Sequence, residues 1–248
     1  MSPPELSIEQ VLAEIGKLPH DWHAVGSVGQ EMLQAIVRHV GDRPITHSME
    51  TGSGKTTLLF SHLSRDHKVF AIEFYGDKAT NSIAGVKASS LFNSATVEYI
   101  EGPTQLTLPR YTFENKLQLA LIDGPHGYPF PDLEYYYIYP HLEEGALLLV
   151  DDIHIATVRH LFDFLKEDEM FELLEVVEKT GFFRRTSVPT FDPLLDGWWL
   201  QNYNKTRFPM DDVDTSPTVI AARDIVRRLK ARVPTRAKKT IKRLLGKS

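Results

Sequence analysis

The sequence predicts an α/β fold in which a mainly parallel sheet is covered by helices on both faces. From residue 45 onward, short apolar runs of strand length alternate with stretches that have helical periodicity. The last two apolar runs have no helical stretch between them, which favours an antiparallel strand at the end of the sheet. A chain of 248 residues that is 42% apolar can bury the core of one such domain.

The elements follow one another in a regular order. Two helices are expected before the first strand, in SIEQVLAEIG and SVGQEMLQAIVRHVG, and Ser27 and Gln30 have the spacing of a capping box in the second. Later helices are expected over residues 57–63, 78–92, 132–142 and 157–166. The seven expected strands are ITHSM, VFAIEF, ATVEYIEG, LQLALIDG, ALLLVDDI, FELLEVVEKTGFFRRT and GWWLQNY.

Charge is distributed unevenly along the chain. Residues 223–248 contain 11 Lys or Arg and one acid, which leaves 17 basic and 32 acidic residues in the rest. We therefore expect one acidic domain over residues 1–222 and a basic amphipathic tail over residues 223–248. Apolar residues recur in the tail at four-residue spacing, so it could lie on an anionic membrane, although a solvated or partner-bound tail is an equal alternative. Nucleic-acid binding is not expected, because the domain is acidic.

The composition also indicates a compartment. The chain has no cysteine, its N-terminus lacks a signal-peptide pattern, and its longest apolar runs are too short to cross a bilayer. The sequence therefore predicts a cytoplasmic protein, with any membrane contact being peripheral at the inner face. Whether the protein forms an oligomer stays open.

The segment GSGKTT at residues 52–57 imitates a triphosphate-binding loop. That loop requires a glycine, four further residues and then Gly54, but the first position is Met49 in this chain, and Glu50 would bring a negative charge toward the phosphates. The sequence therefore disfavours a nucleotide triphosphatase or kinase, which remains the main alternative because ALLLVDD resembles a magnesium-binding strand. Lys55 is expected to be an exposed turn residue.

A second interpretation places Glu50, Gly52 and Gly54 at the end of the first strand of a doubly wound sheet. Glycines at this position let the backbone approach a ligand at the carboxyl end of the strand. Glu73 ends the next strand, where a carboxylate can accept hydrogen bonds from both ribose hydroxyls. The pattern therefore predicts a nucleoside-containing ligand.

Four motifs together resemble a known family. ETGSG, the strand that ends at Glu73, LALIDGPHGY and ALLLVDDIH are similar in order and spacing to class I S-adenosylmethionine-dependent methyltransferases, above all to those that methylate sugars and small molecules. The resemblance implies a Rossmann-like fold and S-adenosylmethionine as cofactor. It also implies the residues that bind the cofactor: Glu50, Gly52, Gly54, Glu73, Glu101 near the adenine, and Asp123.

Asp123, Asp151 and Asp152 follow the fourth and fifth strands, which are neighbours in this topology. Three carboxylates at one edge repel one another unless a cation neutralises them, so a hard divalent ion such as Mg²⁺ fits between them. In the sugar O-methyltransferases that the chain resembles, matching aspartates bind such a metal. Those enzymes carry a second acid where this chain has Pro125, which puts the metal and the base in question.

Two histidines are candidates for the catalytic base. His126 lies in the turn after Asp123, and His154 in VDDIHI is a second candidate for base or metal ligand. A purely structural role is an equal alternative for each. The sequence thus predicts O-methylation of a sugar, glycan or other small-molecule hydroxyl, with a non-catalytic cofactor-binding protein as a further alternative.

Overall fold

The computed structural model describes residues 6–18, 28–72, 82–190 and 201–205, all of which belong to one compact unit that extends from Met1 to Lys205. Glu73, Trp198, Trp199 and the predicted basic tail lie outside the described residues.

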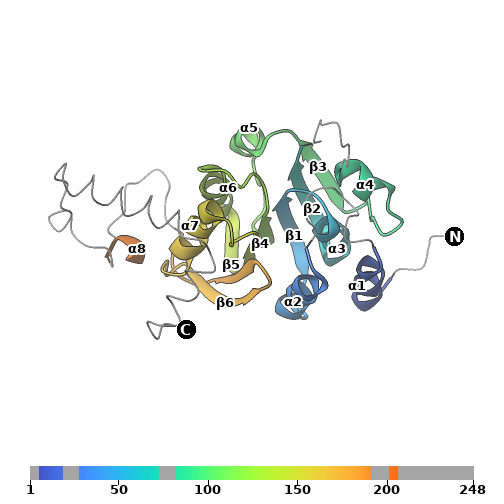
Figure 1. Cartoon of the computed structure of the whole chain (residues 1–248), viewed down its shortest axis with the longest axis horizontal. Coiled ribbons are helices and arrows are strands. Elements are labelled where there is room, and N and C mark those ends of the chain that lie inside the picture. The colour runs from blue at the N-terminus through green and yellow to red at the C-terminus, as the bar shows by residue number, and fades with distance from the viewer. Residues whose placement is uncertain (1–5, 19–27, 73–81, 191–200, 206–248) are drawn as a thin grey trace, which may run out of the picture. The chain divides into compact units, whose positions relative to one another are not determined.

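A seven-stranded sheet forms the centre of this unit (Figure 1). The strand order is β3-β2-β1-β4-β5-β7-β6. The five strands β1 to β5 are parallel, and β7 runs antiparallel to both β5 and β6. This arrangement confirms the predicted doubly wound sheet with an antiparallel last strand. The strands are β1 (Ile45–Thr51), β2 (Ser64–Ala71), β3 (Val97–Glu101), β4 (Leu117–Ile122), β5 (Leu142–Val150), β6 (Phe171–Val177) and β7 (Thr180–Arg185).

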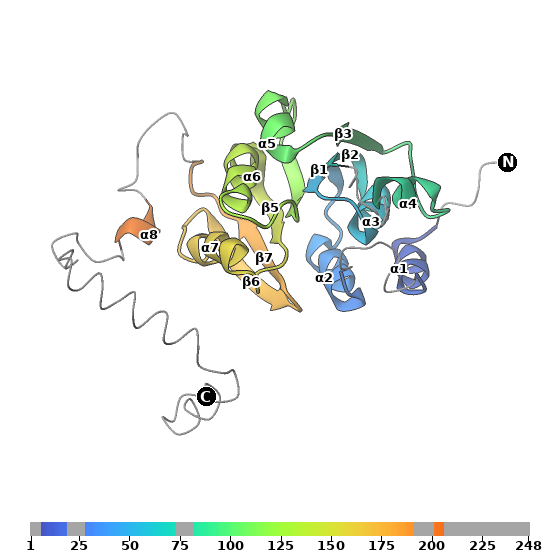
Figure 2. The ribbon, with the colours of Figure 1, turned by 45° about the horizontal axis from the view of Figure 1, so that its top comes forward.

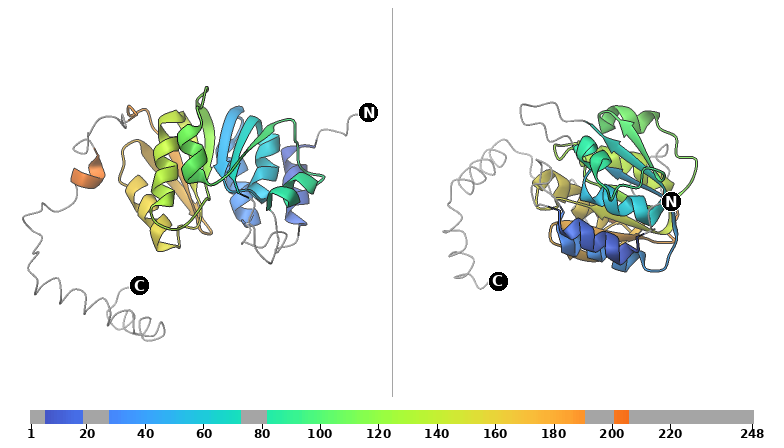
Figure 3. Two further views of the ribbon diagram at one scale, coloured as in Figure 1. Left: turned by 90° about the horizontal axis from the view of Figure 1, so that it is seen from above. Right: turned by 90° about the vertical axis from the view of Figure 1, so that its right-hand side faces the viewer.

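Helices connect the parallel strands and form groups on either side of the sheet (Figures 2 and 3). Several of the expected helices are present with shifted ends, since α4 ends four residues earlier than predicted, at Ala88, and α3 begins two residues earlier, at Lys55. The described helices are α1 (Ile8–Gly16), α2 (Gln30–Val40), α3 (Lys55–Leu63), α4 (Ser82–Ala88), α5 (Thr104–Thr107), α6 (Phe130–Ile138), α7 (Ala156–Leu165) and α8 (Asn202–Lys205), with 3-10 turns at Leu108–Arg110 and Tyr139–His141.

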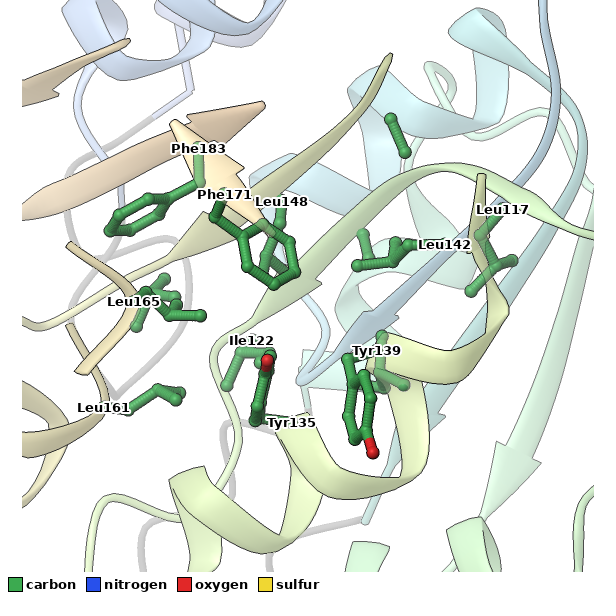
Figure 4. Packing of buried hydrophobic residues seen from close by; sticks show 14 of the residues in the cluster. Leu117, Ile122, Tyr135, Tyr139, Leu142, Leu148, Leu161, Leu165, Phe171 and Phe183 are labelled. Carbon is green, nitrogen blue, oxygen red and sulfur yellow. The ribbon is translucent and has the colours of Figure 1, made fainter. Parts of the chain in front are cut away.

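Alternate residues of the central strands pack on opposite faces. Leu119 and Leu121 of β4 join a cluster formed with α1, α2 and α3, whereas Ala120 and Ile122 join the cluster formed with α6 and α7 (Figure 4). Both faces of β4 are therefore buried, as expected for a parallel strand between two helical layers. Such burial fixes the carboxyl ends of these strands in place.

The last part of the sheet differs from the prediction. FELLEVVEKTGFFRRT was expected to be one strand but forms both β6 and β7, joined by the two-residue turn of Glu178 and Lys179. The seventh strand predicted in GWWLQNY is wrong where the structure describes it, because Asn202–Lys205 is a short helix. The turn was missed because Glu178 adopts φ = 54°, a conformation usually marked by glycine or asparagine.

The predicted capping box of α2 is also wrong. The helix begins at Gln30 with Gly29 as its N-cap, and no side chain of its own caps it. Instead, the Glu178 carboxylate accepts a hydrogen bond from the Gly29 backbone N–H at 3.1 Å. A capping box is present on α1, between Ser7 and Gln10. None of the described helices is long and apolar enough to cross a membrane.

Candidate functional site

A cavity of about 760 Å³ opens at the carboxyl edge of the parallel strands. It lies where the strand order reverses between β1 and β4, which is the usual ligand site in open α/β sheets. Its volume is within the range of small-molecule sites. Its walls come from the ends of β1 to β5 and from the β6–β7 turn, and include Gly52, Gly54, Ala71, Gly102, Thr104, Asp123, His126, Asp151, Asp152, His154 and Lys179.

The glycine loop forms one wall of this cavity. Gly52 has φ = 96°, and a Cβ atom there would lie 2.6 Å from the backbone oxygen of Asp123. Only glycine allows the loop to come this close to the end of β4. Gly54 also lines the cavity, and α3 begins at the next residue. Both predicted glycines are thus at the surface that a ligand would meet.

Glu50 is placed differently from the prediction. Its side chain is fully buried and is absent from the cavity wall. The carboxylate accepts hydrogen bonds from the hydroxyls of Thr56 (2.6 Å) and Thr57, and lies 3.1 Å from Nε2 of His67. Thr57 in turn accepts a hydrogen bond from the Gly54 backbone N–H at 3.0 Å. Glu50 therefore holds the start of α3 against the sheet from below the glycine loop.

Lys55 is buried, so the expectation of an exposed turn residue is wrong. Its ammonium lies 3.4 Å from the backbone oxygen of Leu18, and burial lowers its pKa. The Thr56 hydroxyl, which would bind magnesium in a triphosphate loop, donates to Glu50 instead. These contacts do not support the nucleotide triphosphatase alternative.

The predicted contacts to the nucleoside are only partly described. Glu73 lies outside the described residues, and Glu101 is exposed and pairs with Lys87 at 3.1 Å rather than lining the cavity. Gly102 and Thr104 do line it, and the Thr104 hydroxyl is buried without a hydrogen-bond partner. An unpartnered hydroxyl beside a glycine-lined wall fits a polar ligand such as a nucleoside cofactor.

Two of the three predicted aspartates converge with His126 at the other end of the cavity. Nε2 of His126 lies 3.2 Å from Oδ2 of Asp152 and 3.5 Å from Oδ1 of Asp123. Burial raises the pKa of Asp123, and the neighbouring aspartates add to this effect. The neighbouring Asp123 carboxylate raises the pKa of His126. The three side chains form one polar cluster beside the glycine wall.

Asp151 and Asp152 do not act as a pair. Asp152 adopts φ = 55°, which turns the backbone between the two residues. The Asp151 carboxylate is nearly fully buried and accepts a hydrogen bond from the Thr180 hydroxyl on β7. Among the described residues, the donor atoms that lie within 4.8 Å of one another belong to Asp123, His126 and Asp152, and Asp151 is not part of this group.

Lys179 supplies a positive charge to this group. Its ammonium lies 2.5 Å from Oδ1 of Asp152 and 3.6 Å from Oδ2 of Asp151. The residue lines the cavity from the β6–β7 turn, and its backbone oxygen accepts a hydrogen bond from the Ile153 N–H at 2.9 Å. No sequence motif identified Lys179, because its place depends on a turn that brings a distant strand to β5.

A second residue missed from the sequence is Glu134 of α6. Its side chain is buried, with Oε2 accepting a hydrogen bond from the Thr51 hydroxyl at 2.7 Å. Oε1 lacks a partner and packs against Gly124, where a Cβ atom would lie 2.0 Å away. Burial raises the pKa of Glu134 to about 7. The helical pattern of the segment gave no signal that this glutamate faces inward.

His154 is a weaker candidate than His126. Its side chain is 62% exposed and lies 3.6 Å from Asp152. The aromatic residues after Asp123 also divide: Phe130 lines the cavity, whereas Tyr135 and Tyr139 are core residues.

Comparisons with known proteins agree with this arrangement. Residues 49–153 match the family model of a methyltransferase domain. Over these residues the chain is similar to a methyltransferase domain. The matched residues run from Met49 in β1 to Ile153 after β5, and so contain the glycine loop together with Asp123, His126 and Asp152. No curated protein sequence matches the chain.

Solved structures of methyltransferases share this fold. The O-methyltransferase TomG from Streptomyces achromogenes, involved in tomaymycin synthesis and solved with S-adenosylmethionine, is 15% identical with a TM-score of 0.52, and the match covers 72% of this chain and 90% of TomG. An O-methyltransferase from Bacillus cereus solved with S-adenosylhomocysteine is 15% identical with a TM-score of 0.50, over 75% and 93% of the two chains. At this identity, the likeness shows the fold.

Proposed function

We propose that this methyltransferase domain transfers a methyl group from S-adenosylmethionine to a hydroxyl oxygen of a small molecule. The observation that carries the proposal is the cavity itself, which joins the Gly52 wall to the group of Asp123, His126 and Asp152. The structures of TomG and of the Bacillus cereus enzyme, which contain S-adenosylmethionine and S-adenosylhomocysteine, support the choice of cofactor.

The cofactor would bind along the glycine-lined wall of the cavity. Gly52, Gly54 and Thr104 would hold the cofactor, and Glu73 would accept hydrogen bonds from its ribose. When bound, the cofactor supplies an electrophilic methyl group on a sulfonium. Glu50 acts as a positioning residue, because its buried carboxylate fixes the start of α3 behind the loop.

The acceptor would enter beside the carboxylate group. His126 accepts the hydroxyl proton as the new carbon–oxygen bond forms, and Asp152, 3.2 Å from its Nε2, stabilises the resulting imidazolium. Alignment of the hydroxyl with the methyl group would supply most of the remaining rate acceleration. The polar groups at this end suit an acceptor with several hydroxyls, such as a sugar or glycan, which is the class that the motifs resemble.

The basic tail would determine where in the cell the protein acts. Residues 223–248 carry ten net positive charges and would bring the domain to an anionic membrane. Sedimentation of the full chain with vesicles of anionic and of neutral lipid tests this: retention on anionic vesicles alone, lost in high salt, is expected.

Calorimetry tests the proposed function directly. S-adenosylhomocysteine and ATP with magnesium are titrated separately into the wild-type protein and into Glu73→Ala. We expect micromolar binding of S-adenosylhomocysteine that is lost in the variant, and no binding of ATP. Binding of ATP alone would overturn the proposal. Cofactor binding without methylation of any hydroxyl acceptor would instead indicate a non-catalytic cofactor-binding protein.

A further inference from the structure

Resting on the proposed function, we infer that the Lys179 ammonium takes the place of a divalent metal ion in the acceptor site. The resemblance to sugar O-methyltransferases leads to the expectation of magnesium between the aspartates. Asp123, His126 and Asp152 lie close enough together to hold an ion. Lys179, however, already pairs with Asp152 and supplies the cation that the carboxylates require.

The position of Lys179 is fixed from two directions. Its side chain pairs with Asp152 at 2.5 Å, and its backbone oxygen accepts the hydrogen bond of Ile153 N–H, directly after that aspartate. The next residue, Thr180, donates its hydroxyl hydrogen bond to Asp151. Three contacts thus bind the β6–β7 turn to the end of β5, so the ammonium is part of the site and not a mobile surface charge.

Both oxygens of Asp152 face nitrogen groups. Oδ1 faces the ammonium of Lys179, and Oδ2 lies 3.2 Å from Nε2 of His126. Magnesium prefers six oxygen ligands at about 2.0–2.1 Å. An ion bound to Asp152 would stand close to the ammonium, and the two like charges would repel. Metal binding therefore requires Lys179 to leave.

The charges of the cluster explain why a cation is needed. Asp123, Asp151 and Asp152 place three carboxylates at one end of the cavity, where they disfavour one another's ionised forms. Lys179 offsets one of these charges, since its ammonium lies 2.5 Å from Asp152 and 3.6 Å from Asp151. The ammonium also has three N–H donors and lines the cavity, so it can donate to an acceptor oxygen while bonded to Asp152.

The test is a titration with Mn²⁺, followed by electron paramagnetic resonance of the free ion, on the full-length protein. It compares the wild type with Lys179→Met and with the double variant Lys179→Met/Asp152→Asn. Lys166→Met serves as a matched control, because it removes the same charge from a lysine that pairs with Asp163 and does not line the cavity. Calorimetric titration with S-adenosylhomocysteine is run on every variant.

We expect Lys179→Met to bind Mn²⁺ at least tenfold more tightly than the wild type and Lys166→Met do. The double variant, which also lacks the Asp152 carboxylate, should bind Mn²⁺ as weakly as the wild type. Methylation by the wild type should be insensitive to EDTA. Tight Mn²⁺ binding by the wild type, or no gain in Lys179→Met, would overturn the inference. If S-adenosylhomocysteine fails to bind the wild type, the proposed function itself fails, which is a separate result.

Discussion

The carboxylate of Glu50 on β1 and the imidazole of His67 on β2 lie 3.1 Å apart, and neither side chain is exposed to solvent. Nδ1 of the same imidazole lies 2.8 Å from the Ser48 hydroxyl. Two neighbouring strands and the first turn of α3 therefore share one buried polar network. Groups buried in this way stabilise a fold only when each has a partner.

Replacing Glu50 by glutamine should loosen this network. The amide offers one oxygen to the Thr56 and Thr57 hydroxyls and adds donors that face His67, so we expect a loss of about 1–3 kcal/mol in the free energy of unfolding. S-adenosylhomocysteine should also bind more weakly, because the glycine loop would be less firmly positioned by the start of α3. Urea unfolding and calorimetry measure the two effects.

Glu14→Gln is the control for this change. Glu14 forms an exposed ion pair with Lys17, and such pairs contribute less than about 1 kcal/mol. Equal stability of the two variants would show that the buried network contributes nothing of its own.

Substituting Gly52 by alanine should abolish cofactor binding. The new Cβ atom would lie 2.6 Å from the backbone oxygen of Asp123, and φ = 96° is unfavourable for alanine. We expect a destabilisation of about 1–3 kcal/mol together with loss of S-adenosylhomocysteine binding. Gly85→Ala in α4 is the matched control, since nothing lies within 4 Å of its Cβ position, and it should gain up to about 1 kcal/mol. Normal binding by Gly52→Ala would contradict the close approach.

The buried Glu134 should make stability depend on pH. Its pKa is about 7 in the folded protein, against about 4.5 for an exposed glutamate. The folded state thus keeps this proton to higher pH than the unfolded chain does. Between about pH 4.5 and about pH 7 the free energy of unfolding should therefore fall, by up to about 3 kcal/mol, and then level off.

Glu134→Gln removes this dependence and keeps an oxygen for the Thr51 hydroxyl. Urea unfolding of both proteins from about pH 5 to about pH 8 should show a flatter profile for the variant. The exposed Glu144, changed to glutamine, should leave the wild-type profile unchanged. Parallel profiles for wild type and Glu134→Gln would mean that Glu134 is ionised in the folded state.

The two candidate bases can be separated by asparagine substitutions. His126→Asn should lower kcat by about 10²–10⁴-fold, because the side chain beside Asp123 and Asp152 can no longer accept a proton. His154→Asn should change kcat by less than about tenfold, since that imidazole is largely exposed. Binding of S-adenosylhomocysteine should be retained in both. The opposite ranking would assign the base to His154.

The sequence predicted those parts of the fold that depend on local pattern. Apolar runs such as LQLALI form strands buried on both faces, and the residues at their ends reach one edge because parallel strands share a direction. The glycine wall, Asp123 and His126 were found for this reason. The roles of these residues in cofactor binding and catalysis remain predictions, as does that of Glu73, which lies outside the described residues.

The parts that the sequence did not predict depend on side-chain direction and on distant contacts. Nothing in VDDIH shows that Asp152 adopts a left-handed conformation and that Asp151 therefore turns toward Thr180. Likewise, the inward position of Glu134 follows from the packing of α6 on β4, not from its own residue type. Periodicity identifies a buried face, but it does not identify the polar partner of one residue on that face.

The turn between β6 and β7 has a consequence for how such chains can diverge. Glu178 accepts a hydrogen bond from the Gly29 N–H at the start of α2 and Lys179 pairs with Asp152, so two adjacent residues join the turn to two different parts of the chain. Side chains alternate along a strand, and inserting or deleting one residue here would reverse both directions at once. Related chains that keep a lysine in this role should therefore also keep the length of the turn, and those with a longer turn should be the ones that need a metal.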